Sequence, residues 1–201
     1  MKVLSKDFFL NDTVKVAQNL IGKYLKHSLP EGEVMGRIVE TEAYLSRDDP
    51  ACHAFRGKTR RNEAMFGSPG TSYVYLIYGM YYCFNVVTQK EGVGEAVLIR
   101  ALEPLKGIDY MRYRRGTSKQ YDITNGPGKL CQAMGINKEH NGKSLNQGNL
   151  IILDSKEKPP IEKSPRIGIN VAAEKLLRFY IPGNPYVSDF KKNNKITGRL
   201  P

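Results

Sequence analysis

Two carboxylates and a phenol alternate along one short segment of the chain, at Glu40, Glu42 and Tyr44. The surrounding residues 34–45 predict a β-strand, in which side chains two positions apart point to the same side. The three groups therefore share one face of the strand. Carboxylates are rarely buried without partners, so this face indicates acid–base chemistry or contact with a ligand. An edge strand with a solvated acidic face is the alternative, and these residues alone leave both interpretations open.

Arg100 is the second candidate for chemistry, because it lies inside the apolar run Ala96–Ala101. An unpaired charge in such a strand would be costly. The arginine therefore needs a carboxylate partner, and the strand that carries Glu40 and Glu42 supplies the obvious ones.

Tyrosines gather in two neighbouring runs, Tyr73–Tyr78 and Tyr81–Val87, which Gly79 and Met80 separate. Aromatic and β-branched runs around such a break predict a tight β-hairpin. An aromatic face of this hairpin would stack on a base, and its tip would act as a wedge between base pairs. A tyrosine-rich core is the alternative.

The charge of the chain indicates a polyanionic partner. It has 201 residues, with 31 Lys+Arg against 20 Asp+Glu and a formal net charge of +11. Nucleic acid is the first candidate for that partner, and an anionic membrane surface is the second. No apolar run reaches the roughly 18 residues of a transmembrane helix, and no signal peptide is recognisable at the N-terminus. We therefore expect a soluble, unexported protein.

Neither a disulfide framework nor a metal site is predicted. The three cysteines form no C-x-x-C pair, and the histidines are scattered without the spacing of common zinc motifs. These residues are Cys52, Cys83, Cys131, His27, His53 and His140.

The remaining elements follow from periodicity and from turn residues. Apolar residues at helical spacing predict an amphipathic helix over 13–26, and a short helix starts at Gly126 and runs through Met134. Residues 46–72 form a long polar loop that contains Arg60 and Arg61, which are candidates for phosphate contacts, and 106–119 form a second basic segment. Further short strands are predicted at Leu150–Leu153, Arg166–Asn170 and Leu176–Tyr180.

A basic domain with a carboxylate strand, an aromatic strand and a wedge-like tip has the parts needed to flip a nucleotide and cut its glycosidic bond. The sequence also resembles the alkyladenine (3-methyladenine) DNA glycosylases of the single-domain type, from about Leu10 to Ser188. The resemblance implies an α+β fold: a single domain over residues 1–201, with a curved, mostly antiparallel β-sheet flanked by helices and a protruding β-hairpin. Its strongest blocks are Arg37–Leu45, Pro69–Asn85, Leu98–Leu105, Gly126–Ala133, Arg166–Gly168 and Leu177–Tyr180.

The same resemblance implies a role for each matching residue. Glu42 corresponds to the catalytic carboxylate, and Arg100 and the backbone carbonyl of Ile167 correspond to the groups that hold the attacking water. The residues implied for the base pocket are Tyr44, His53, Tyr75 and Asn85; for intercalation and groove contacts Tyr78, Met80 and Tyr81; and for a phosphate contact Lys129. Two departures from the family pattern occur: the loop between His53 and Asn62 is one residue shorter, and the turn between Asn85 and Arg100 is two residues longer.

The chemistry fits these residue types. Cleavage of an N-glycosidic bond develops positive charge on the sugar, and a carboxylate such as Glu42 stabilises that charge and can accept a proton from water. An alkylated purine carries a positive charge already, so stacking on aromatic rings favours it by about 1–2 kcal/mol when desolvated. With no amine nucleophile evident, we expect hydrolysis to an abasic site without strand cleavage.

The expected partner is double-stranded DNA that contains damaged purines: 3-methyladenine, 7-methylguanine, hypoxanthine or ethenoadenine. We expect a monomer that needs no cofactor or metal and binds no membrane. In a bacterium it would act in the cytoplasm at the nucleoid, and in a eukaryote in the nucleus.

Two rival functions belong to other classes. In the first, a non-enzymatic minor-groove or RNA-binding protein, the tyrosines stack on bases and the carboxylates only pair with Arg100. In the second, a carbohydrate hydrolase, Glu40 and Glu42 act together. Neighbours on one strand face do not flank a substrate from opposite sides, and a basic protein suits a neutral sugar poorly.

Overall fold

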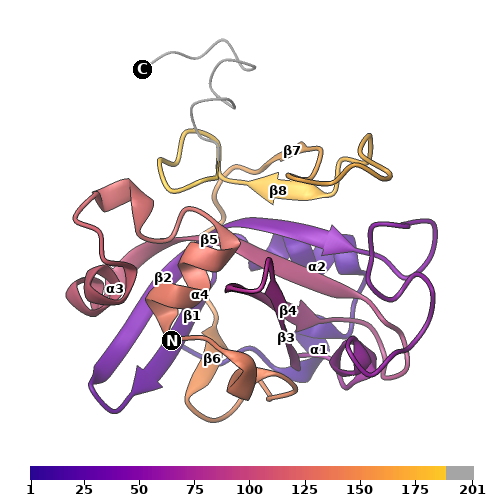
Figure 1. The fold of residues 1–201 in the computed structure, drawn as a ribbon, viewed down its shortest axis with the longest axis horizontal. Helices are drawn as coiled ribbons and strands as arrows, with labels where there is room; N and C mark the ends of the chain where they lie inside the picture. Colours follow the sequence, from indigo (N-terminus) through magenta and orange to yellow (C-terminus); the bar gives the residue numbers. More distant parts are fainter. Residues whose placement is uncertain (189–201) are drawn as a thin grey trace.

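A curved antiparallel sheet forms the centre of the structure (Figure 1). This computed structural model describes residues 1–188. The strand order is β3 (Ser72–Ile77), β4 (Tyr81–Val87), β5 (Ala96–Lys106), β2 (Gly32–Tyr44), β1 (Tyr24–Leu29) and β6 (Leu150–Leu153). Two further strands, β7 (Glu162–Ser164) and β8 (Arg178–Tyr180), pair with each other, and β8 also joins β2.

The long strand β2 organises the sheet. One of its edges pairs with β5 over most of its length, and the other pairs first with β1 and then with β8. The register with β5 shifts on both sides of Glu40. Bulges of this kind bend a strand and increase its twist, so the sheet curls at the point where β8 is added.

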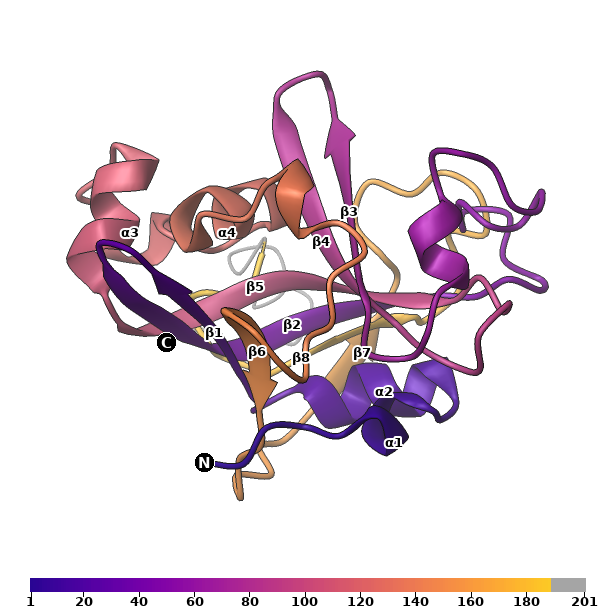
Figure 2. The ribbon, with the colours of Figure 1, turned by 90° about the horizontal axis from the view of Figure 1, so that it is seen from below.

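Helices cover both faces of the sheet (Figure 2). The helices α1 (Lys6–Phe9) and α2 (Thr13–Leu20) lie on one side, and α3 (Ile108–Arg115) and α4 (Pro127–Met134) lie on the other. Three short 3-10 helices complete the described elements: η1 (Glu63–Phe66), η2 (Gln120–Asp122) and η3 (Lys138–His140). The predicted α+β class, with a curved antiparallel sheet and flanking helices, is confirmed.

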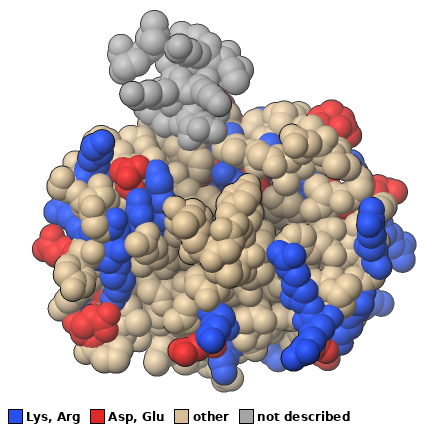
Figure 3. Space-filling view, in the orientation of Figure 1, with Lys and Arg blue, Asp and Glu red and all other residues tan. Residues whose placement is uncertain are grey.

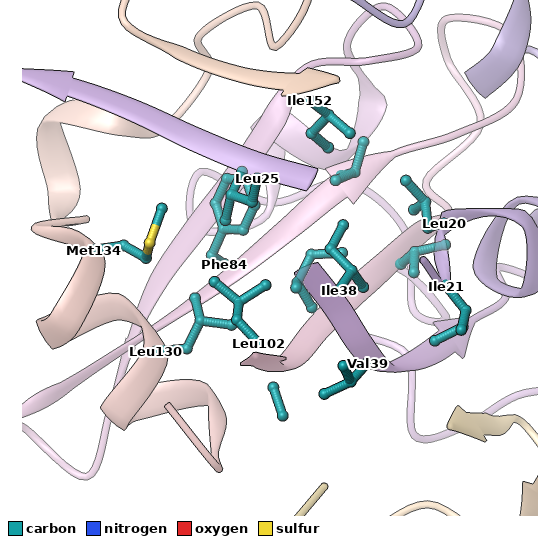
Figure 4. Packing of buried hydrophobic residues seen from close by; sticks show 14 of the residues in the cluster. Leu20, Ile21, Leu25, Ile38, Val39, Phe84, Leu102, Leu130, Met134 and Ile152 are labelled. Carbon is teal, nitrogen blue, oxygen red and sulfur yellow. The ribbon is translucent and has the colours of Figure 1, made fainter. Parts of the chain in front are cut away.

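The main core fills the space between the sheet and its helices (Figure 4). Leu20 of α2 and Leu130 of α4 are fully buried against apolar strand residues such as Ile38 and Leu102. A second, smaller cluster lies under the segment between β2 and β3 and consists of Cys52, Ala54, Met65, Tyr73, Val87 and Ala96. Tyr44 and Tyr75 pack against this smaller core.

The predicted helix over 13–26 is wrong beyond Leu20. Gly22 takes a left-handed conformation with φ +86°, and Tyr24 and Leu25 lie in β1, paired with both β2 and β6. Glycine tolerates this conformation and ends the helix. Along β1 the buried positions alternate at Leu25 and His27. Pairing with the two neighbouring strands therefore overrides the helical spacing of the apolar residues.

Other predicted bounds also change. Residues Arg166–Asn170 form a turn and no strand, β8 begins at Arg178 and not at Leu176, and β5 continues to Lys106. Helices α1 and α3 were not predicted; α3 buries only Met111 and carries four charged residues, so its apolar signal is weak. Strand β6 and helix α4 are confirmed.

The tyrosine-rich hairpin β3–β4 is confirmed and projects from the body of the protein (Figure 2). At its tip Tyr78 has φ 53° and Gly79 has φ 69°. A tyrosine in the left-handed region is uncommon. The turn thereby presents the Tyr78 ring to solvent, with 84% of its surface exposed.

A substitution at Gly94, just before β5, tests the packing that supports the segment between β2 and β3. A Cβ atom there would lie 2.5 Å from the Ala54 Cβ and 2.7 Å from the Phe66 ring. Gly94→Ala should therefore lower the free energy of unfolding by about 1–3 kcal/mol, the usual cost of overpacking. Urea denaturation measures this loss. Ala54→Gly in the same chain removes the nearest clashing atom and should restore part of the stability; equal stability of wild type and Gly94→Ala would contradict the packing described here.

Candidate active site

Glu40 lies at the centre of a buried ion cluster. Its side chain has no exposed surface, and its Oε1 accepts hydrogen bonds from Arg178 Nε at 2.5 Å and from Arg100 Nε at 3.3 Å. Its Oε2 accepts from the backbone N–H of Ser188 at 2.7 Å. A carboxylate held from three sides and closed to solvent is structural. The alternative of an edge strand with a solvated acidic face is wrong.

Glu42 is equally buried but is held by groups that border a cavity. Its Oε1 accepts from the backbone N–H of Ile167 at 2.8 Å and lies 3.3 Å from Arg100 Nη1. Its Oε2 accepts from the Tyr44 hydroxyl at 2.9 Å. Arg100 thus bridges Glu40 and Glu42, which confirms the predicted pairing of this arginine with the carboxylate strand. The two carboxylates raise the pKa of the guanidinium although burial lowers it, so Arg100 remains charged.

The cavity has a volume of about 370 Å³ and opens between the hairpin, the loop after β2 and the start of α4. Glu42 does not border it, but Tyr44, Arg100 and Ile167 do. The full lining is Tyr44, Ala51, His53, Arg61, Tyr75, Ile77, Tyr78, Tyr81, Cys83, Leu98, Arg100, Pro127, Gly128, Ile167, Gly168 and Ile169. The cavity is large enough to admit a nucleotide base, and the buried carboxylate lies directly behind its wall.

Aromatic rings form the inner walls. The rings of His53 and Tyr75 meet edge to face, with their centroids 4.6 Å apart. Burial raises the pKa of both Tyr44 and Tyr75, so each phenol stays neutral at physiological pH. His53 is partly exposed at the cavity, and its partial burial, with a smaller contribution from the charge of Arg61, lowers its pKa below the usual 6.5. These three rings are therefore uncharged near pH 7, so none of them repels a cationic base through a charge of its own.

His53 is fixed by two contacts that the sequence did not suggest. Its Nδ1 lies 2.9 Å from the hydroxyl of Tyr73, and its carbonyl accepts from Asn62 Nδ2 at 2.8 Å. The buried Asn62 also donates to the Gly57 carbonyl and accepts from the Thr59 N–H, so one side chain braces the loop from His53 to Asn62.

Asn85 lies deeper, at a small recess that Tyr44, His53 and Tyr75 also border. It is 3% exposed, and its Nδ2 donates to the Tyr73 carbonyl at 3.0 Å. The structure thus brings Asn85 to the implied pocket, although part of its side chain is engaged in holding β3.

Two of the predicted wedge residues, Tyr78 and Tyr81, border the cavity, and Met80 lies between them in the chain. Tyr78, Met80 and Tyr81 are all exposed at the hairpin tip. Tyr81 packs against the start of α4, where a Cβ atom on Gly128 would lie 3.0 Å from the Tyr81 Cβ. Glycine at that position lets the helix start approach the hairpin closely.

The predicted DNA-backbone residues have different surroundings. Arg60 and Arg61 are exposed, and Arg61 borders the cavity. Lys129 is engaged within the protein, with its Nζ 2.5 Å from Asp122 and 3.0 Å from the Asn125 side chain. Lys and Arg side chains lie on both sides of a mostly uncharged central area on the face that carries the hairpin (Figure 3).

Two functional candidates escaped the sequence analysis as individual residues. Arg178 was predicted only as part of a strand, yet it neutralises Glu40. Arg166 was placed in a strand that does not exist, yet its guanidinium forms a buried ion pair with Asp49. Each lies in an apolar or turn segment with no acidic residue within three positions in the sequence, and an arginine in such a segment was the available signal.

Among residues 1–188, no group of three or more His, Cys, Asp or Glu side chains is arranged to hold a metal ion. Within the same residues, no helix is long and apolar enough to cross a membrane.

The chain matches known proteins over nearly its whole length. Residues 7–185 match the family model described as Methylpurine-DNA glycosylase (MPG). A protein of Methanoculleus marisnigri is 50% identical over 186 residues, which cover 90% of this chain and 96% of that protein. A protein of Chlorobaculum tepidum is 46% identical over 94% of this chain and 91% of its own length. Both are provisionally named 3-methyladenine DNA glycosylase.

Glu40→Gln tests the structural role of the buried cluster. The variant leaves Arg178 buried beside an uncharged amide, and breaking a buried pair from one side typically costs about 3–5 kcal/mol. We expect a fall in unfolding free energy of that order in chemical denaturation. The double variant Glu40→Gln/Arg178→Met should be more stable than the single one, because it removes the orphaned charge. A single variant as stable as the wild type would show that the cluster does not contribute to the fold.

Proposed function

The chain belongs to the methylpurine-DNA glycosylase family and is a DNA repair glycosylase, and on that premise we propose that Glu42 and the cavity beside it carry out base excision. The substrates proposed are 3-methyladenine, 7-methylguanine, hypoxanthine and ethenoadenine in duplex DNA, and the product is an abasic site. The observation that carries this proposal is the geometry of Glu42: a carboxylate without solvent exposure, held by Tyr44, Arg100 and Ile167, which themselves border a cavity large enough for a base.

Glu42 acts on the sugar in this mechanism. As the glycosidic bond breaks, positive charge develops near C1′ of the flipped nucleotide, and the fixed negative charge stabilises it. Glu42 also accepts a proton from the attacking water, which would lie against Arg100 and the Ile167 backbone at the cavity wall. The N–H of Ile167 and the hydroxyl of Tyr44 fix both carboxylate oxygens, so little reorganisation is needed in the transition state.

Aromatic walls select the base. Tyr44 on one side and His53 with Tyr75 on the other would sandwich a flipped purine. Electron-poor or cationic rings stack best on such walls. Because the pKa of His53 is lowered, the imidazole is neutral near pH 7 and does not repel an alkylated base.

The hairpin tip holds the nucleotide outside the duplex. Tyr78 is the most exposed of the aromatic side chains beside the cavity, and it would fill the gap left by the flipped nucleotide while Met80 and Tyr81 contact the groove. Exposed Arg60 and Arg61 on one side would contact the phosphate backbone. Lys129 would contact a phosphate through the donor that Asp122 and Asn125 leave free, or by exchanging Asp122 for the phosphate. The enzyme acts as a monomer in this proposal.

Glu42→Gln tests the catalytic carboxylate. The amide keeps the shape but loses the charge and the base, so single-turnover excision should fall by about 10²- to 10⁴-fold while lesion-DNA binding survives. The matched control is Glu40→Gln, which removes the neighbouring buried carboxylate and should retain a rate close to wild type in its folded fraction. A Glu42→Gln rate near that of wild type would refute this mechanism. Abasic sites that break in hot alkali distinguish excision from binding alone.

Tyr78→Ser tests the wedge. Loss of one stacking interaction weakens the flipped state by about 1–3 kcal/mol. Excision of hypoxanthine from a stable pair should therefore fall more than excision of the same base from a mismatch, which unstacks at lower cost. The two single-turnover rates are measured side by side; equal losses on both substrates would assign Tyr78 to another role.

Asn85→Ser tests whether this side chain excludes undamaged guanine from the base pocket. Guanine differs from hypoxanthine by its 2-amino group, and a clash or an unpaired donor beside Asn85 would cost about 1–3 kcal/mol. Shortening the side chain should raise guanine release, most clearly from mispairs, relative to hypoxanthine release. Asn85 also holds the Tyr73 carbonyl, so the melting temperature is measured as well. A lower melting temperature with an unchanged ratio would leave Asn85 as scaffold.

A further inference from the structure

A buried cation lies against the outer face of the Tyr44 ring. The guanidinium carbon of Arg166 is 4.6 Å from the ring centroid, within the range of a cation–π contact. Tyr44 borders both the main cavity and the small recess beside Asn85, but Arg166 borders neither. The guanidinium therefore occupies the face of the ring opposite to the one a base would use.

Arg166 is held rigidly in that position. Its two terminal nitrogens donate to the carboxylate oxygens of Asp49 at 2.6 and 2.7 Å, and one of them also donates to the Ala43 carbonyl at 3.0 Å. The side chains of Arg166 and Asp49 are 1% and 0% exposed. Asp49 in turn accepts from the N–H of Leu45, so the pair fixes the chain on both sides of Tyr44.

The catalytic carboxylate depends on the same segment. Ile167 follows Arg166 directly, and its N–H donates to Glu42 Oε1. The Arg166–Asp49 pair thus fixes the back of the base-stacking ring and the backbone that orients Glu42. Such a pair could be purely structural, but an apolar pair of similar volume often serves stability as well or better. A charge behind this ring also acts electrostatically on whatever stacks in front of it.

We propose that Arg166 is a positioning residue that sets, through Tyr44, the balance between cationic and neutral damaged bases; this inference rests on the base-excision function proposed above. The face of an aromatic ring is negative and attracts one cation. Arg166 on one face of the Tyr44 ring draws the π electrons toward itself, so a cationic base on the other face is attracted less strongly. The positive charge of Arg166 also repels the cationic base across the ring. A neutral base such as hypoxanthine meets no such penalty.

Asp49 moderates this effect. Its carboxylate neutralises part of the guanidinium charge, while the guanidinium is the group that lies over the ring. Removing both charges should favour cationic bases, and removing only the carboxylate should disfavour them. The opposite signs distinguish an electrostatic role from a packing role, because damage to packing would slow excision of both classes together.

The test measures single-turnover excision of 7-methylguanine, which is cationic, and of hypoxanthine, which is neutral, in the same duplex sequence. The ratio of the two rates is independent of the fraction of active protein, so partial unfolding of a variant does not obscure it. For Arg166→Gln/Asp49→Asn the ratio of 7-methylguanine to hypoxanthine excision should rise about three- to tenfold, the range of a cation–π contact of this kind. For Asp49→Asn alone it should fall by a similar factor.

Asp48→Asn is the matched control. It changes the net charge by the same amount as Asp49→Asn at the neighbouring position, but Asp48 is exposed and its side chain is not paired with Arg166. Its ratio should equal that of the wild type. Ratios within twofold of wild type in both test variants, or shifts of the same sign in both, would overturn the proposed role of Arg166. A wild-type chain that excises neither base would instead refute the function on which it rests.

Discussion

Burial of two carboxylates side by side on one strand is the constraint on which this structure depends. Glu40 and Glu42 lie on the same face of β2, and neither has any exposed surface. Removing a charge from water costs several kcal/mol unless it is paired and hydrogen-bonded. Arg100 bridges the two carboxylates, Arg178 completes the charge balance at Glu40, and the N–H groups of Ser188 and Ile167 supply further donors.

These requirements shape the sheet around the site. The bulges beside Glu40 turn β2 so that β8 can pair with it, and β8 brings Arg178 to the carboxylate. The turn that replaces the expected strand at Arg166–Asn170 brings the N–H of Ile167 to Glu42. One carboxylate is enclosed by the fold, and the other is held just behind a cavity wall. Glu40 is therefore the structural carboxylate, and Glu42 is the candidate catalytic one.

The cavity needs a further kind of support, because part of its wall comes from irregular segments, the one between β2 and β3 that carries His53 and the turn that carries Ile167. The smaller core under the loop carries Tyr73 and the packing partners of Tyr44 and Tyr75. Asn62 braces the loop that bears His53, and the Arg166–Asp49 pair braces the other wall behind Tyr44. The rings are thereby preorganised, which reduces the entropy lost when a base enters. The family membership and the cavity support the same reaction, and the electrostatics of the walls bear on which bases take part in it.

The sequence by itself determined the local features of this protein. Alternation placed Glu40, Glu42 and Tyr44 on one strand face, the break at Gly79 located the hairpin, and the cost of a lone charge predicted a carboxylate partner for Arg100. Tertiary structure decided whatever depends on neighbours distant in sequence. The helix expected over 13–26 ends at Leu20, and the chain from Tyr24 forms a strand because β2 and β6 offer hydrogen bonds on both sides. Likewise, only the fold pairs Arg178 with Glu40 and Arg166 with Asp49. Each arginine lies more than a hundred residues from its carboxylate, and no local sequence pattern predicts a pair at that separation.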